Sequence, residues 1–192
     1  MSTHEPEPIE PVVLEAGGLR LRPWREDDVD DAWAALQDPA VRMWNGGSAR
    51  SREDTADLLR RRGDWSAGDH ASWAVVDRAD GVLLGSVSLH SIDRVQGNAQ
   101  VGYWTAAAAR GRGVAPTAVD AVCRWAFGAL PVDRIELCHA VENEASGRVA
   151  AKAGFTYEGR PRRSFRYGDG AKHDELLWSR LDDDPPPPSG TR

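Results

Sequence analysis

The chain is 192 residues long, 41% of its residues are hydrophobic, and its formal net charge at pH 7 is −6. This length fits one domain that can bury a core of its own. The negative charge argues against broad nucleic-acid binding, because phosphates attract basic proteins. No apolar run approaches the roughly 20 residues that span a bilayer, and the N-terminus lacks an apolar export segment. We therefore expect a cytoplasmic protein with no membrane or nucleic-acid partner.

The predicted elements follow the order β-α-α-β-β-β-α-β-α-β-β. They are a strand at 19–23, helices at 27–36 and from 51, strands at 73–77, 82–90 and 98–105, a helix at 114–130, a strand at 134–141, a helix at 145–153, and strands at 155–159 and 173–181. A loop at 41–50 contains Trp44, Asn45, Gly46 and Gly47, and a basic loop at 160–172 joins the last two strands.

Local signals support these boundaries. The pair Asp80-Gly81 is typical of a hairpin turn between two strands. Pro116 suits the first turn of a helix, and Gly154 suits a helix C-terminus. Residues 1–11 are expected to form a flexible lead, 12–181 one domain, and 182–192 a disordered Pro-rich tail.

Two cysteines, Cys123 and Cys138, match neither a disulfide framework nor the spacing of zinc ligands. We therefore expect no metal in the site. Cys138 falls on a predicted strand, where a lone thiol is more often part of the core than a nucleophile.

The most informative segment is Arg110-Gly111-Arg112-Gly113-Val114-Ala115, between a predicted strand and a predicted helix. Its glycines allow a tight turn and a close backbone approach to a ligand. The following helix start offers unpaired N–H groups and a positive dipole end, which suit a phosphate or pyrophosphate. A solvated arginine pair is the alternative interpretation. The glycine spacing fits neither a dinucleotide fingerprint nor a P-loop.

Three segments share the order and spacing of motifs in one enzyme family. The loop at 110–115 reads R-x-x-G-x-A, residues 101–104 read V-G-Y-W, and residues 143–155 read N-x-x-S-x-x-V-x-x-K-x-G-F. With these motifs the chain resembles the GNAT N-acetyltransferases, and within them the RimJ/RimL-type branch. The resemblance runs from about Leu19 to Leu181.

The resemblance implies an α/β (α+β) GNAT fold. Its mixed, mostly antiparallel sheet has helices on both faces, and two splayed strands leave a wedge for coenzyme A. The residues that would hold acetyl-CoA are Tyr103, Trp104, Thr105, Arg110, Gly111, Arg112, Gly113, Val114, Ala115, Thr117 and Asn143. The rings of Tyr103 and Trp104 could equally fill the core, and Asn143 could equally cap a helix.

Two residues are predicted to take part in catalysis. Ser146 would donate a hydrogen bond to the leaving CoA sulfur, although a serine in a first helical turn can also be structural. Gln100 stands where many relatives have a glutamate, so that base is lost. His139 is the candidate general base, with a structural histidine as the alternative. Lesser candidates are Glu142, Asp174 and Glu175, whereas His90 and His173 have no motif support.

The expected activity is transfer of an acetyl group from acetyl-CoA to a primary amine by direct attack. The amine would be a protein N-terminus, as in the RimJ/RimL-type branch, or a small amine. Trp44 would contact this acceptor, or else anchor the core. An acyl-CoA-binding sensor without turnover, or a structural partner that binds no ligand, are the alternatives. The resemblance allows a homodimer and leaves open the acceptor and whether the acyl group is acetyl or succinyl.

Overall fold

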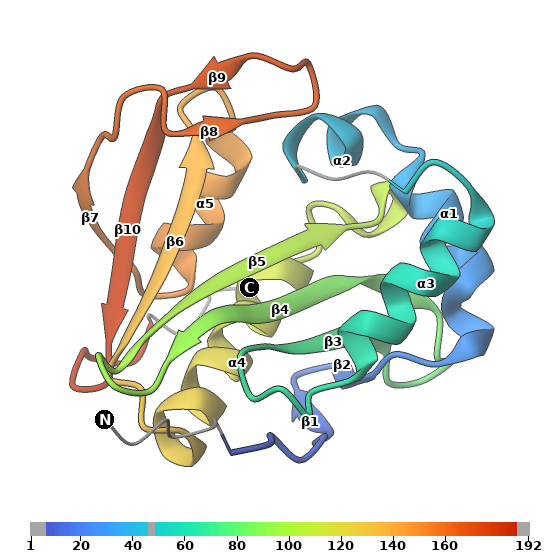
Figure 1. The fold of residues 1–192 in the computed structure, drawn as a ribbon, viewed down its shortest axis with the longest axis horizontal. Helices are drawn as coiled ribbons and strands as arrows, with labels where there is room; N and C mark the ends of the chain where they lie inside the picture. Colours follow the sequence, from blue (N-terminus) through green and yellow to red (C-terminus); the bar gives the residue numbers. More distant parts are fainter. Residues whose placement is uncertain (1–6, 46–48, 188–192) are drawn as a thin grey trace.

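The computed structural model describes residues 7–45 and 49–187, which form one eight-stranded sheet and a separate hairpin (Figure 1). The strands of the sheet lie in the order β1-β2-β3-β4-β5-β6-β10-β7. Their bounds are β1 Leu14–Ala16, β2 Leu19–Pro23, β3 Ala71–Asp77, β4 Leu83–Asp93, β5 Asn98–Thr105, β6 Arg134–Ala140, β7 Thr156–Gly159 and β10 Glu175–Leu181. The hairpin pairs β8, Phe165–Arg166, with β9, Lys172–His173.

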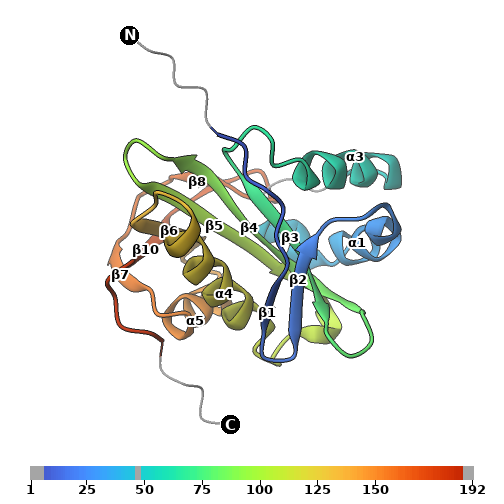
Figure 2. The ribbon, with the colours of Figure 1, turned by 90° about the horizontal axis from the view of Figure 1, so that it is seen from below.

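Helices cover both faces of this sheet. The described residues contain α1 Val29–Leu36, α2 Pro39–Trp44, α3 Arg52–Gly63, α4 Val114–Ala129 and α5 Glu144–Lys152. Figure 2 shows α4 and α5 on one face and α1 and α3 on the other. Within the described sheet, β5 and β6 run parallel and every other neighbouring pair is antiparallel. The predicted mixed, mostly antiparallel sheet with helices on both faces is confirmed.

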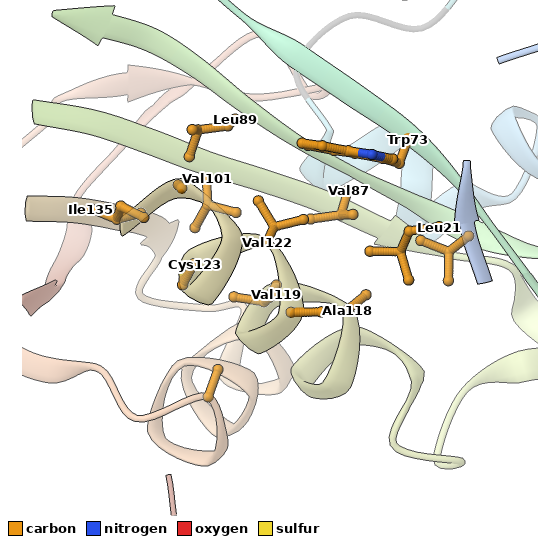
Figure 3. Packing of buried hydrophobic residues seen from close by; sticks show 14 of the residues in the cluster. Leu21, Trp73, Val87, Leu89, Val101, Ala118, Val119, Val122, Cys123 and Ile135 are labelled. Atoms are coloured by element: carbon orange, nitrogen blue, oxygen red, sulfur yellow. The ribbon is translucent and has the colours of Figure 1, made fainter. Parts of the chain in front are cut away.

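The larger core lies between the sheet and α4 (Figure 3). Val119 and Val122 of α4 are fully buried and belong to the same cluster as Val87, Leu89 and Val101 of the sheet. The apolar residues of α4 recur every three or four positions, so one stripe of the helix faces the sheet. This packing fixes the N-terminus of α4 at the end of β5.

A second core lies on the opposite face, under α1 and α3. It contains Trp24, Leu36, Leu59, Val76 and Trp104. The ring of Trp104 stacks on Trp24 with a centroid separation of 6.4 Å and is 6% exposed. Trp104 is therefore a core residue of this face, as the alternative interpretation of its ring proposed.

The predicted loop at 41–50 is wrong for its first residues, because α2 extends from Pro39 to Trp44. Asp38 begins this helix, and its Oδ1 accepts hydrogen bonds from the N–H groups of Ala40 and Val41 at 3.0 and 3.1 Å. A proline also suits the first helical position. Gly46 and Gly47 lie outside the described residues.

Short strands account for some of the other differences. β1 has three residues, and β8 and β9 have two each. Such short segments show no alternation of polar and apolar residues that the sequence could reveal. The hairpin β8–β9 occupies part of the predicted basic loop.

The packed part of the chain is longer than the predicted domain at 12–181. Ile9 is 5% exposed, and its N–H donates to the carbonyl of Trp65 at 3.2 Å. Near the other end, a Cβ atom at Gly154 would lie 3.3 Å from Pro187. Among the described residues, no helix is both long and apolar enough to cross a membrane.

Candidate active site

The site begins where β5 and β6 separate. We call the region between the diverging ends of these two strands the split. Their parallel pairing extends from Asn98 and Arg134 to Gln100 and Glu136 and no further. Beyond this point β5 continues to Thr105 and β6 to Ala140, and Figure 1 shows the two strands diverging towards α2 and the β8–β9 hairpin. In the described part of the chain, the edge of β5 that faces β6 therefore has no strand partner from Val101 onward. An extended ligand can pair with such an edge.

The loop after β5 has the backbone shape that anion binding requires. Gly111 and Gly113 both have φ of +77°, a left-handed conformation that L residues rarely adopt. Gly113 is the N-cap of α4 and no side chain caps the helix. The N–H groups of Val114 and Ala115 in the first turn thus remain free of helical acceptors, and Pro116 has none to satisfy. Thr117 donates its N–H back to Gly113 at 3.2 Å.

Both arginines of the loop make contacts with carboxylates. Arg110 forms an ion pair with Asp38, and this guanidinium holds the pKa of the Asp38 carboxyl below its usual value. Arg112 approaches Asp77 at 3.4 Å. A surface hollow beside the loop is lined by Gly17, Gly18, Leu19, Asp77, Arg112, Gly113, Val114 and Thr117. Any phosphate bound here would compete with these carboxylates for the arginines.

A hydrogen bond joins the two walls of the split. The hydroxyl of Tyr103, on β5, lies 2.6 Å from Oγ of Ser146, in the first turn of α5. Burial raises the pKa of Tyr103 to about 12, so its hydroxyl stays protonated at neutral pH. Asn143 is the N-cap of α5, and its Oδ1 accepts from the N–H of Ser146 at 3.3 Å. The structure thus brings together three residues that the sequence predicted for the site.

His139 lies apart from this bridge and uses both of its ring nitrogens. Nδ1 donates to the carbonyl of Ala140 at 2.8 Å, and Nε2 accepts from the indole N–H of Trp178 at 3.1 Å. The ring is 3% exposed, and α5 packs so closely that a Cβ atom at Gly147 would lie 3.2 Å from Nε2. Burial lowers the pKa of His139. With no free nitrogen facing a ligand, this geometry argues against the predicted role of general base.

The opposite face of β6 and β10 presents a different set of groups. Glu175 is 8% exposed and accepts a hydrogen bond from the hydroxyl of Tyr167 at 2.8 Å. Cys138 is exposed rather than part of the core, because its position on β6 points away from α4 and α5. Although the residue as a whole is exposed, partial burial of its sulfur, and then the charges of Glu175 and Glu136, raise the pKa of this thiol to about 12. The thiol is therefore protonated at neutral pH.

Trp44 packs against the β8–β9 hairpin, beyond the diverging ends of β5 and β6. Its ring makes edge contacts with Tyr167 and His173, with centroid separations of 5.6 and 6.3 Å. The contact between the two segments is tight, since a Cβ atom at Gly168 would clash with the carbonyl oxygen of Arg42. We call α2 and the hairpin the roof of the split (Figure 1).

His173 fixes the hairpin side of the roof. Its Nε2 lies 2.9 Å from Asp169 and its Nδ1 lies 3.2 Å from Glu142. The hydrogen bond to Asp169, and then that to Glu142, raise the pKa of His173. Tyr167, which joins Trp44 to Glu175, was not predicted for the site. No motif marks it, whereas the pair Asp38-Pro39 is a helix-start signal that could have revealed α2.

Metal ligands do not gather in the described part of the chain. Across residues 7–45 and 49–187, no three histidine, cysteine, aspartate or glutamate side chains are grouped to hold an ion.

Comparison with protein families defines the class. The model of the Acetyltransferase (GNAT) domain matches residues 18–156, and the chain therefore belongs to the GNAT acetyltransferase family. The predicted family and the GNAT fold are confirmed.

Individual relatives are similar to the chain in sequence or in fold. The Bacillus subtilis (strain 168) protein named "Putative ribosomal N-acetyltransferase YdaF" is 38% identical over 102 residues, which cover 53% of this chain and 55% of that protein. The chain thus spans about half the length of this relative. The structure of RimL, named a ribosomal L7/L12 alpha-N-protein acetyltransferase in complex with coenzyme A, superposes with a TM-score of 0.81 at 20% identity and covers 90% of this chain and 100% of that one.

A second structure has the same architecture. It is a ribosomal-protein-S5-alanine acetyltransferase from Vibrio fischeri, with a TM-score of 0.79 at 24% identity, and it covers 90% of this chain and 98% of that one. At these identities the two structures show a shared fold.

Proposed function

We propose that this protein transfers an acetyl group from acetyl-CoA to a primary amine, and that the amine is the N-terminus of a ribosomal protein. The hydrogen bond between Tyr103 and Ser146 across the split is the observation that most supports catalysis. It places two hydroxyl groups between the free edge of β5 and the first turn of α5, where a CoA sulfur would lie. A protein that only senses acyl-CoA has no need of proton donors at that point.

The binding of acetyl-CoA follows from the shape of the split. The pantetheine arm would pair with the free edge of β5 along Tyr103, Trp104 and Thr105, and the pyrophosphate would meet the N–H groups of Gly113 to Ala115. Arg110 and Arg112 would exchange carboxylate partners for phosphate, which forms strong charge-assisted hydrogen bonds with arginine. The amide nitrogen of Asn143 would donate to the arm, since its oxygen already caps α5.

Chemistry at the thioester requires help for the leaving group. The amine nitrogen attacks the thioester carbon, a C–N bond forms, and the C–S bond breaks as CoA leaves. In the pair of hydroxyls, Tyr103 can donate to Ser146, so that the Ser146 hydroxyl donates to the sulfur. Because a thiol has a pKa of about 8.5, this aid to the leaving thiolate is modest. Most of the rate enhancement would come from holding the two substrates together.

The acceptor is inferred from the relatives. YdaF, RimL and the Vibrio fischeri protein are all named for acetyl transfer to ribosomal proteins. In this chain the roof formed by α2 and the hairpin closes one end of the split, so the acceptor would approach across the face that carries Cys138 and Glu175. A flexible chain end fits such a restricted approach better than a folded surface does.

A direct assay tests this function. Purified protein is mixed with acetyl-CoA and with peptides that copy ribosomal-protein N-termini, polyamines or aminoglycosides, and thiol release is followed. We expect turnover with at least one N-terminal peptide and little with the other amines. Binding of CoA by calorimetry without turnover of any amine would instead identify a sensor. Turnover of polyamines or aminoglycosides alone would exclude the ribosomal acceptor and retain the acetyltransferase.

A further inference from the structure

His90, on β4, lies on the sheet face where the acceptor would approach. Its neighbours Val87 and Leu89 belong to the core beneath α4. Val87 and Leu89 point towards α4, and because side chains of a strand alternate between faces, His90 points towards the side of α1 and α3. Gln100 of β5 and Glu136 of β6 are in register with His90, so the three residues form one row across the sheet. This row crosses the sheet at the last pair before β5 and β6 separate.

The imidazole of His90 leans along β5 towards the split. A Cβ atom at Gly102 would lie 3.3 Å from Nε2 and 3.7 Å from Cδ2 of His90. The missing side chain of Gly102 therefore leaves the space that the ring occupies. Gly102 directly precedes Tyr103 and lies past the last β5–β6 pair. The ring thus stands beside the segment of β5 that would hold the thioester.

The two ring nitrogens of His90 differ in their surroundings. Nδ1 lies 3.4 Å from the hydroxyl of Ser91. Nε2 has no hydrogen-bond partner among the described residues, and it is not one of the enclosed polar atoms that lack a partner. It is therefore reachable by solvent or ligand. In His139, by contrast, both nitrogens are engaged.

The backbone next to His90 is shaped in an unusual way. Ser91 has φ of +51°, which is rare for a residue other than glycine. The register of the β4–β5 pairing shifts between His90 and Asp93. Bulges of this kind change the direction of side chains and are frequent next to active sites. The irregularity thus holds the imidazole at the end of the regular ladder.

The charges around the ring favour its neutral form. Burial, followed by the positive charges of Arg62 in α3 and His70 in the segment after it, lowers the pKa of His90. On its own strand Ser88 is uncharged, and on β5 the facing residue is Gln100. Glu136 of β6, in the same row, is paired with Arg134 at 3.0 Å. The imidazole is therefore neutral near pH 7 and has a nitrogen lone pair to offer.

We propose that Nε2 of His90 accepts the proton of the attacking amine. This assignment rests on the proposed acetyl transfer and supplies its missing base. As the amine nitrogen bonds to the thioester carbon, its proton moves to Nε2, while the C–S bond breaks and the sulfur leaves as a thiolate. The hydroxyls of Ser146 and Tyr103 hold the thiolate by hydrogen bonds until it takes a proton from water, and His90 returns the amine proton to water. Gln100 lies in the same row, but its amide cannot titrate, so His90 rather than Gln100 acts as the base.

The test compares pH profiles of kcat/KM for thiol release with an N-terminal peptide. For the wild type we expect a limb with an apparent pKa below about 6.5, in addition to the limb of the amine near 8. His90→Gln should lower kcat/KM by about 10²-fold and remove the lower limb. CoA affinity by calorimetry and the melting temperature should stay close to wild type. His139→Gln is the matched variant, and it should keep the lower limb even where the loss of its packing lowers the rate.

Rescue gives a second measurement. His90→Ala should regain a large part of the lost rate when imidazole is added, whereas His139→Ala should regain none. Retention of the lower limb in His90→Gln, or loss of the limb in Glu175→Gln instead, would overturn the assignment while the transferase function stands. Failure of the wild-type protein to turn over any amine would overturn both.

Discussion

The two faces of the sheet differ in how their functional residues are encoded. On the face of α4 and α5, the loop at 110–115 and the turn from Asn143 to Ser146 are short contiguous segments. On the face of α1 and α3, the residues around the split come from α2, β4, β10 and the β8–β9 hairpin. The proposed cofactor would be bound mainly by local backbone geometry. The proposed acceptor would be bound by side chains that come from distant parts of the chain.

The bridge between the two walls gives the largest expected effect on the cofactor side. Ser146→Ala should lower kcat by roughly ten- to a hundredfold, because the leaving thiolate would lose the hydrogen bond that the Ser146 hydroxyl donates to it. Tyr103→Phe should lower kcat less, since Ser146 keeps its own hydroxyl. Steady-state kinetics and CoA calorimetry separate the two outcomes. A rise in the dissociation constant of CoA with kcat unchanged would make the bridge a binding element only.

The pyrophosphate loop allows a matched comparison between the faces. Gly113→Val should weaken CoA binding by at least about tenfold, or about 1.4 kcal/mol, because the valine side chain would occupy space that the pyrophosphate needs. Gly170, in the β8–β9 turn, has φ of +79° and equally open space around its Cα.

Gly170→Val is therefore the control for backbone strain. Both variants should have a lower melting temperature than the wild type. Calorimetry should detect weaker CoA binding in Gly113→Val alone. Equal loss of affinity in both would show that strain, and not the loop, controls binding.

The roof is the corresponding element on the acceptor side. Trp44→Ala should raise the KM of the amine several-fold and leave the KM of acetyl-CoA nearly unchanged, because Trp44 contacts Tyr167 and His173 rather than the loop. Trp44→Phe should retain most of the affinity for the amine. If the alanine variant lowers only the melting temperature and neither KM changes, Trp44 is a core anchor.

The smallest expected effect concerns the pH dependence of the roof. The pKa of His173 is raised by Asp169 and Glu142, so its charged form stabilises the fold below about pH 6.5. This contribution disappears as the pH rises through the raised pKa in the folded state. The difference in melting temperature between wild type and His173→Gln should therefore be larger at pH 5.5 than at pH 8.5. A difference that is the same at both values would show that His173 acts through packing alone.

The sequence by itself determined the fold class and the cofactor side of the site. The signals that predicted them act over a few residues: strand periodicity, the Asp80-Gly81 turn and the glycines of the loop. A short stretch of sequence is therefore enough to predict their structural effect. The positive φ of Gly111 and Gly113 and the capping of α5 by Asn143 agree with those local signals.

Only the tertiary structure decided which side chains are available for chemistry. His139 and His90 both lie on strands, and no local pattern distinguishes them. Trp178, on the neighbouring strand β10, donates a hydrogen bond to Nε2 of His139, whereas the absent side chain of Gly102 leaves room for the ring of His90, whose Nε2 has no partner among the described residues. Hydrogen-bond partners and burial depend on which strands and helices become neighbours, and contacts between residues far apart in sequence determine that arrangement.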